Sequence, residues 1–141
     1  MAAYVKYQLG IEKMMEGGNA GTDTWQLILS NTAPNVATNT TAASCTELGT
    51  AGGYTAGGVN CTVTFAASTA GVYKLILAAP VSPTWTANTT GFTFQYVILY
   101  NLTQTQAIGY WDYGSPVVMN GGNADTFTPT LDASGGTFTI T

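Results

Sequence analysis

The chain has 141 residues, which corresponds to a single domain with a sizeable core. Only 7% of its residues carry a charge, against about 25% in an ordinary soluble domain, and 45% are hydrophobic. The net charge is -4, with three lysines and neither arginine nor histidine. This composition excludes histidine-based nucleophile and zinc sites, and it lacks the basic surface that nucleic-acid binding requires.

The chain also lacks the sequence features of an exported or membrane protein. Lys6 and Glu12 interrupt any N-terminal apolar run long enough for a signal peptide, and no later run approaches the roughly 18 apolar residues of a transmembrane helix. We therefore expect a soluble protein, made in the cytoplasm, without a membrane partner. The seven acidic residues are dispersed, so we expect no catalytic residues, no cofactor and no metal.

Residues 3–16 are predicted to form the only helix. The apolar stripe that indicates it, at spacings of three and four, consists of Tyr4, Tyr7, Ile11 and Met14 or Met15. Gly17 and Gly18 follow, and glycine favours the end of a helix.

From residue 24 to the C-terminus the pattern predicts β-structure. Trp25, Leu27 and Leu29 alternate with Thr24, Gln26 and Ile28, as in a strand with two different faces. The further predicted strands span 59–65, 72–79, 84–86, 91–101, 107–114, 125–131 and 137–141. Short strands at this spacing are typical of a sandwich or barrel. We predict one domain, 1–141: a mostly β, antiparallel β-sandwich, jelly-roll-like, with one short N-terminal helix.

The strand at 91–101 is predicted to be central and buried on both sides. One face is expected to carry Phe92, Phe94, Tyr96, Ile98 and Tyr100, and the other Val97 and Leu99. In the two C-terminal strands, Phe127, Leu131, Phe138 and Ile140 are expected to face inward, and the alternating threonines, including Thr137, outward.

Three connecting segments have distinct compositions. Residues 30–43, rich in Asn, Thr and Ala, are predicted to be a long surface loop or an arm ordered only by a neighbour. The sequence GGYTAGG at 52–58 predicts a sharp backbone excursion. Asp112 is expected to cap a turn formed by Gly114, Ser115 and Pro116.

Cys45 and Cys61 leave two interpretations open. A disulfide between them would close a loop and stabilise the fold by about 3 kcal/mol. The interpretation we favour has free thiols, with Cys61 buried on the core face of its strand and Cys45 near the surface, as suits cytoplasmic synthesis.

The tryptophans suggest a carbohydrate-binding surface as one alternative function. Trp25 and Trp111 lie within strand patterns, so we expect them in the core. Trp85 lies in a proline-bounded segment, PVSPTWT, where an aromatic side chain is more readily exposed.

Several elements, in this order, resemble small β-sandwich virion proteins of tailed bacteriophages. The resemblance rests on DTWQL at 23–27, GYTAGG at 53–58, TWT at 84–86, an apolar strand ending in Tyr100-Asn101, WDYGS at 111–115 and the C-terminal FTIT. It covers most of the chain and implies a capsid cement or decoration protein on the capsid surface of the virion, made in the host bacterial cytoplasm.

A neutral, threonine-rich surface agrees with this role, because repeated packing brings identical charges together. We expect a homotrimer that binds the major capsid protein across coat-protein junctions. The candidate contact residues are Tyr4, Tyr7, Ile11, Met15, Asn35, Val36 and Trp85. The alternatives are a tail or spike component, or a carbohydrate-binding or adhesin module.

Overall fold

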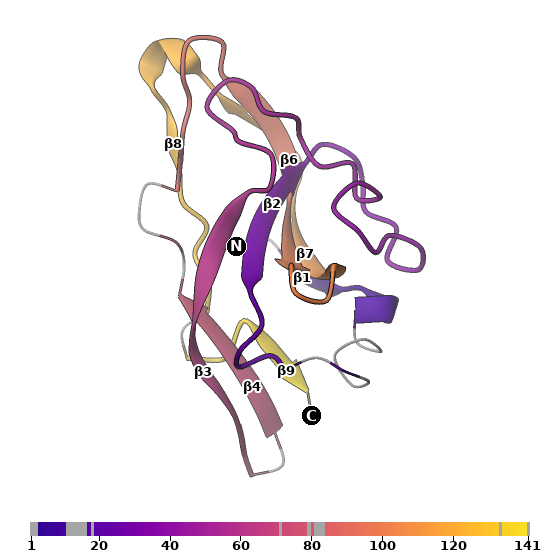
Figure 1. The fold of residues 1–141 in the computed structure, drawn as a ribbon. Helices are drawn as coiled ribbons and strands as arrows, with labels where there is room; N and C mark the ends of the chain where they lie inside the picture. The colour runs from indigo at the N-terminus through magenta and orange to yellow at the C-terminus, as the bar shows by residue number, and fades with distance from the viewer. Residues whose placement is uncertain are drawn as a thin grey trace.

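The computed structural model describes residues 3–10, 17, 19–70, 72–78, 80, 84–132 and 134–140, and shows a mostly β, antiparallel protein (Figure 1), as the sequence predicted. Its strands are β1 (Ala3–Lys6), β2 (Trp25–Ser30), β3 (Val59–Thr69), β4 (Val72–Ala78), β5 (Trp85–Thr86), β6 (Phe92–Asn101), β7 (Gln106–Met119), β8 (Thr126–Phe127) and β9 (Phe138–Ile140). One turn of 3-10 helix, η1 (Gly121–Asn123), precedes β8.

Seven of these strands form one sheet in the order β1-β7-β6-β2-β3-β4-β9, in which every neighbouring pair is antiparallel. β5 and β8 form a separate two-stranded sheet. The large sheet curls so that its two edge strands approach each other. Lys6 Nζ on β1 donates a hydrogen bond to the Thr139 carbonyl oxygen on β9, at 3.2 Å, and lies over the Phe138 ring. We call the gap between β1 and β9 the seam.

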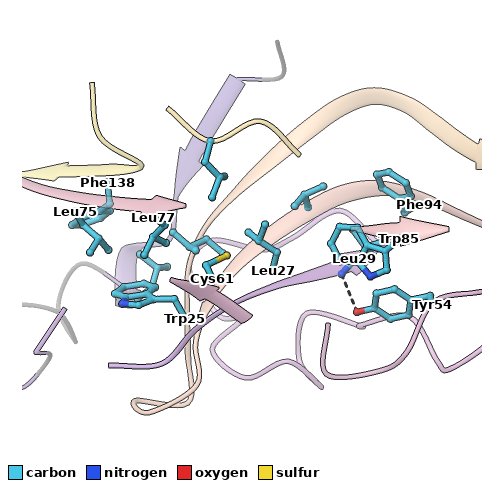
Figure 2. Close-up of a cluster of buried hydrophobic side chains, with 14 of the residues drawn as sticks. Trp25, Leu27, Leu29, Tyr54, Cys61, Leu75, Leu77, Trp85, Phe94 and Phe138 are labelled. Atoms are coloured by element: carbon cyan, nitrogen blue, oxygen red, sulfur yellow. Dashed lines mark hydrogen bonds between the residues drawn. The ribbon is translucent and has the colours of Figure 1, made fainter. Parts of the chain in front are cut away.

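The sheet carries a hydrophobic core on each face, because successive side chains of a strand point to opposite sides. The inner core, which the curl encloses, includes Trp25, Leu27, Leu29, Cys61, Leu75, Leu77, Trp85, Phe94 and Phe138 (Figure 2). The outer core includes Tyr7, Ile28, Cys45, Tyr96, Ile98, Tyr100 and Ala107. The predicted alternation along β2 is therefore confirmed.

The segment 31–43 follows β2 and covers part of the outer core (Figure 1). Val36 and Ala42 pack against this core. Two backbone hydrogen bonds hold the segment in place: Gln8 N donates to Val36 O at 3.0 Å, and Ala107 N donates to Thr40 O at 2.7 Å. It is thus a surface loop ordered by its own domain, and the alternative of an arm ordered only by a neighbour is wrong.

The predicted helix at 3–16 is wrong over its first four residues, which form β1. A helix would place Tyr4 and Tyr7 on one face. In the structure Tyr4 packs against the inner core and Tyr7 lies in the outer core, as an odd spacing along extended chain requires. Residues 8–10 are helical, and the remaining predicted residues, 11–16, lie outside the described part of the chain.

β6 is central and buried on both sides, as predicted, but its faces change partway along. The register against β7 shifts between Phe94 and Tyr96, so Gln95 forms a bulge. The bulge reverses the alternation, and Phe94 consequently shares the inner core with Val97 and Leu99 rather than facing outward with Tyr96.

β7 does not end at the predicted turn around Gly114. Tyr96 pairs with Asp112 and Phe94 pairs with Val117, so residues 113–116 bulge out of the ladder before the strand resumes. The expected bond of Asp112 does form, because its Oδ1 accepts from Gly114 N at 2.7 Å. The turn chemistry was thus predicted correctly, but pairing with β6 carries the strand through it.

The C-terminal strands are shorter than predicted. β8 spans only two residues, since Pro129 has no N–H to continue a ladder, although Leu131 is still buried in the inner core. Thr137 is buried and not outward-facing: its Oγ1 accepts a hydrogen bond from Leu77 N at 3.2 Å. The side chain of Ile140 lies outside the described part of the structure.

Candidate functional site

The residues that the sequence offered as partner contacts do not form one surface. Tyr7 and Trp85 are buried, at 0% and 4% exposure, and Val36 is half-buried against the outer core. Asn35 is exposed in the loop after β2, and Tyr4 is half-buried beside the seam. Ile11 and Met15 lie outside the described residues.

Trp85 is a core residue rather than an exposed aromatic side chain. Its ring lies 6.1 Å from that of Tyr54 and stacks on Phe127 at 5.9 Å, between centroids. Trp25 is also buried, as expected, and its Nε1 donates to Ala20 O at 2.9 Å. Trp111, which was expected in the core, packs against the inner core but is only half-buried, and Tyr113 is 37% exposed; both lie on β7.

Two adjoining cavities, of about 340 and about 240 Å³, open along the seam side of the sheet. The larger is lined mainly by Val97, Trp111, Tyr113, Phe127, Pro129 and Leu131. The smaller, at the seam itself, is lined by residues that include Tyr4, Lys6, Trp111, Asp132, Phe138 and Thr139. Trp111 and Thr130 line both, so the two cavities lie side by side, and we call them together the seam cleft, with a larger and a smaller lobe.

Tyr4 forms part of the wall of the smaller lobe. Its ring packs on Trp111, with centroids 4.8 Å apart, and crosses the backbone of Gly109, where a Cβ atom would lie 2.1 Å from the hydroxyl. The hydroxyl is buried and has no hydrogen-bond partner among the described residues. Burial raises the pKa of this phenol, so Tyr4 remains a neutral hydroxyl.

The two cysteines are unpaired and buried in cores on opposite faces of the sheet. Cys61 lies in the inner core, and burial raises the pKa of its thiol to about 12. Cys45 lies in the outer core, not near the surface as expected, with its Sγ 3.6 Å from the hydroxyl oxygen of Tyr7. Burial raises its pKa as well. Neither thiol is placed to act as a nucleophile.

Every described carboxylate accepts a hydrogen bond from the protein's own backbone or amides. The bonds are Asn101 Nδ2 to Asp23, Gly57 N to Glu47, Gly114 N and Gln95 Nε2 to Asp112, Asn120 N to Asp125, and Ser134 N and Gly135 N to Asp132. These bonds hold the pKa of Asp112 and of Asp132 below the usual range. The described carboxylates therefore fix turns and strand ends.

Both described lysines are also bonded within the fold. Lys6 donates to the Thr139 carbonyl oxygen, and Lys74 donates to the Ser134 carbonyl oxygen at 3.4 Å. Among the described residues, no group of three or more cysteine, aspartate or glutamate side chains is placed to hold a metal ion. The chemistry of the seam cleft is thus that of aromatic rings, hydroxyls and backbone groups.

No helix within the described ranges is both long and apolar enough to cross a membrane. No protein-family model, curated protein or solved structure matches this chain.

Proposed function

We propose that this protein is a structural component of a bacteriophage virion, a cement or decoration protein that binds the major capsid protein across coat-protein junctions. It stabilises the shell by burying surface on several coat subunits at once, so that rupture must break all of these contacts together. In this proposal the protein acts as a homotrimer on the capsid surface.

The main support for this proposal is that the few charged side chains are hydrogen-bonded within the protein itself. All seven charged side chains in the described ranges (Lys6, Asp23, Glu47, Lys74, Asp112, Asp125 and Asp132) are bonded to the protein's own atoms. The charged groups are few and held in place, so the rest of the surface is left to uncharged side chains. Such a surface suits dense repeated packing, because a low density of charge reduces the like-charge repulsion between identical copies.

The exposed apolar side chains support a contact role as well. Val118 is 69% exposed on β7, and Leu102, Val5 and Tyr113 are also exposed. Tyr113 is the first of the bulged residues 113–116, and Val118 lies two residues beyond the bulge. A subunit that packs on this part of β7 would remove these side chains from water.

The test is the position of the protein in the particle and the salt dependence of its binding. Labelled protein should bind to head shells and raise the temperature at which they rupture. Because the chain carries few charges, the dissociation constant should change less than about threefold between 50 and 500 mM salt. Labelling confined to tails or fibres would move the protein to the tail or spike alternative and overturn the capsid role.

A carbohydrate-binding module is the second candidate, and the larger lobe of the seam cleft is the observation that favours it. Partly apolar pockets with a few polar groups are typical of small-ligand sites, and the rings of Trp111, Tyr113 and Phe127 line this one. Titration with neutral maltose-, cellulose- and chitin-derived oligosaccharides should then change the fluorescence of the wild-type protein but not of Trp111→Ala. An unchanged wild-type signal with all three series would remove this candidate.

A further inference from the structure

The open edge of β1 has backbone groups that point into the seam. Antiparallel strands exchange backbone hydrogen bonds at every second residue pair. Tyr7 N donates to Ile108 O at 2.9 Å, and the register of β1 against β7 runs into this bond without a shift. The alternation therefore directs the backbone N–H and C=O of Tyr4 and Lys6 away from β7.

The loop after β2 closes the chain immediately beyond this edge. Gln8, two residues past the end of β1, donates its N–H to Val36 O of that loop, at 3.0 Å. The loop therefore satisfies Gln8 and does not extend along the edge at Tyr4 and Lys6. Beside Tyr4 and Lys6, the described part of the chain supplies no further strand.

β1 and β9 do not pair with each other, and the smaller cavity, of about 240 Å³, is lined by residues of both strands. The contact between them that crosses the seam is the 3.2 Å hydrogen bond from Lys6 Nζ to the Thr139 carbonyl oxygen. This oxygen points into the seam from β9, where an added strand would find an acceptor, and the ammonium group of Lys6 caps it.

Strand direction favours one added strand between β1 and β9 over direct pairing of these two strands. In a sheet of seven antiparallel strands, the first and last run the same way, so β1 could pair with β9 only in parallel. A single strand that runs the opposite way would be antiparallel to both. Its inward side chains would enter the smaller lobe of the cleft, between Trp111 and Phe138.

The flanking edges also determine the kind of strand that fits. An edge strand of a folded copy already has a neighbour on one side, and that neighbour would collide with β9 or β1. A lone extended segment has both edges free. The aromatic rings of the smaller lobe match an apolar side chain on this segment.

We propose that the seam binds one extended segment of the coat protein, which hydrogen-bonds to the outward backbone groups of Tyr4 and Lys6 and inserts an apolar side chain between Trp111 and Phe138. This inference rests on the capsid role proposed above. Lys6 moves off the Thr139 carbonyl oxygen as the segment enters. In the free protein this charged side chain blocks unspecific pairing at the open edge of β1.

A matched pair of variants at one position tests the backbone contact. Lys6→Pro removes the outward N–H, and proline is tolerated where the N–H of an edge strand does not pair. Lys6→Ala removes the same side chain but keeps the N–H. In co-sedimentation with head shells that lack this protein, Lys6→Ala should bind at least as tightly as wild type, because the segment no longer has to displace the ammonium group from the Thr139 carbonyl oxygen. Lys6→Pro should bind roughly tenfold more weakly than Lys6→Ala.

Hydrogen exchange of the full-length wild-type protein supplies a readout that does not depend on how the proline variant folds. The amides of Tyr4 and Lys6 should exchange rapidly in the free protein and become protected on shells. Binding to shells without this protection would overturn the seam contact and leave the capsid role intact. Absence of shell binding would overturn both proposals. Protection that rises with protein concentration in the absence of shells would identify a second copy as the occupant and refute the coat-protein segment.

Discussion

The hydroxyl of Tyr54 completes the end of β2, and its removal should destabilise the fold in a measurable way. β3 pairs with β2 only as far as Leu27, so Leu29 N has no strand partner on that side. Tyr54 Oη accepts from Leu29 N at 3.2 Å, as Figure 2 shows, and donates to Glu47 Oε1 at 2.6 Å. Both Leu29 and Tyr54 are buried.

Tyr54→Phe keeps the shape of the ring and removes both hydrogen bonds. A buried N–H left without a partner costs about 1–3 kcal/mol, whereas half-buried Glu47 can recover part of its lost bond from water. We therefore expect the free energy of unfolding to fall by about 2–4 kcal/mol. Urea unfolding should show a lower midpoint at an unchanged slope.

Two controls make this result specific to the buried hydroxyl. Tyr113→Phe, at a partly exposed ring, should change the free energy of unfolding by less than about 0.5 kcal/mol. Glu47→Gln keeps an oxygen acceptor for Tyr54 Oη and Gly57 N, so it should cost less than Tyr54→Phe. A Tyr54→Phe protein as stable as the Tyr113→Phe control would refute the role of this hydroxyl.

Three further predictions concern a turn, the thiols and acid stability. Gly53→Ala should lower the free energy of unfolding by more than about 3 kcal/mol in thermal unfolding, because φ at Gly53 is +108° and a Cβ atom would lie 2.1 Å from a backbone oxygen. Gly57→Ala is the control: φ at Gly57 is also positive, at +96°, but the space around it is open, so the cost should be about 1 kcal/mol. Cys45 and Cys61 should react with a thiol reagent at pH 8 only after unfolding, and two reactive thiols per chain without reductant would confirm the absence of a disulfide. The Gly135 and Ser134 amides lower the pKa of Asp132 in the folded protein. The stabilisation that Asp132 gives is therefore present above the unfolded pKa of about 3.9 and is lost as pH falls through the lower folded pKa. Asp132→Asn should consequently lose less stability than wild type when the pH falls below about 4.

The strands were largely predictable because their signal is local. The alternation of Trp25, Leu27 and Leu29 fixes a face whatever the partner strand, and the structure confirms it. The glycines of the GGYTAGG turn likewise act locally: Gly53 has a positive φ and approaches the backbone of Thr86 too closely for any side chain.

The errors occurred where a distant strand determines the local structure. The tyrosine spacing at 4 and 7 fits a helix by itself, yet pairing with β7 makes this segment a strand. The signals at Asp112 and Gly114 correctly predict a local hydrogen bond, but they cannot reveal that Val117 resumes pairing with Phe94. The bulge at Gln95 has no signature in its own residues, since it follows from the register against β7.

The seam cleft could not be predicted for the same reason. Tyr4 and Phe138 lie at opposite ends of the sequence and at opposite edges of the sheet, and only the curl brings them to one cavity. Trp111 was expected in the core because it lies in a strand pattern. It does pack against the inner core, but its position on β7 next to the edge strand β1 leaves it half-buried, so that it also lines the cleft.

Lysine substitutions at exposed threonines test whether folding or assembly requires the low charge of the chain. Thr62 on β3 and Thr126 on β8 are exposed, and replacing threonine by lysine on an open strand face changes strand preference by less than about 1 kcal/mol. Thr62→Lys and Thr126→Lys should therefore remain folded and lose little stability in urea. If the neutral surface serves assembly, variants of this kind placed at an interface should weaken shell binding, and high salt should partly restore it. Charged variants across the exposed threonines that all fold and bind like wild type would show that the neutral surface serves neither purpose.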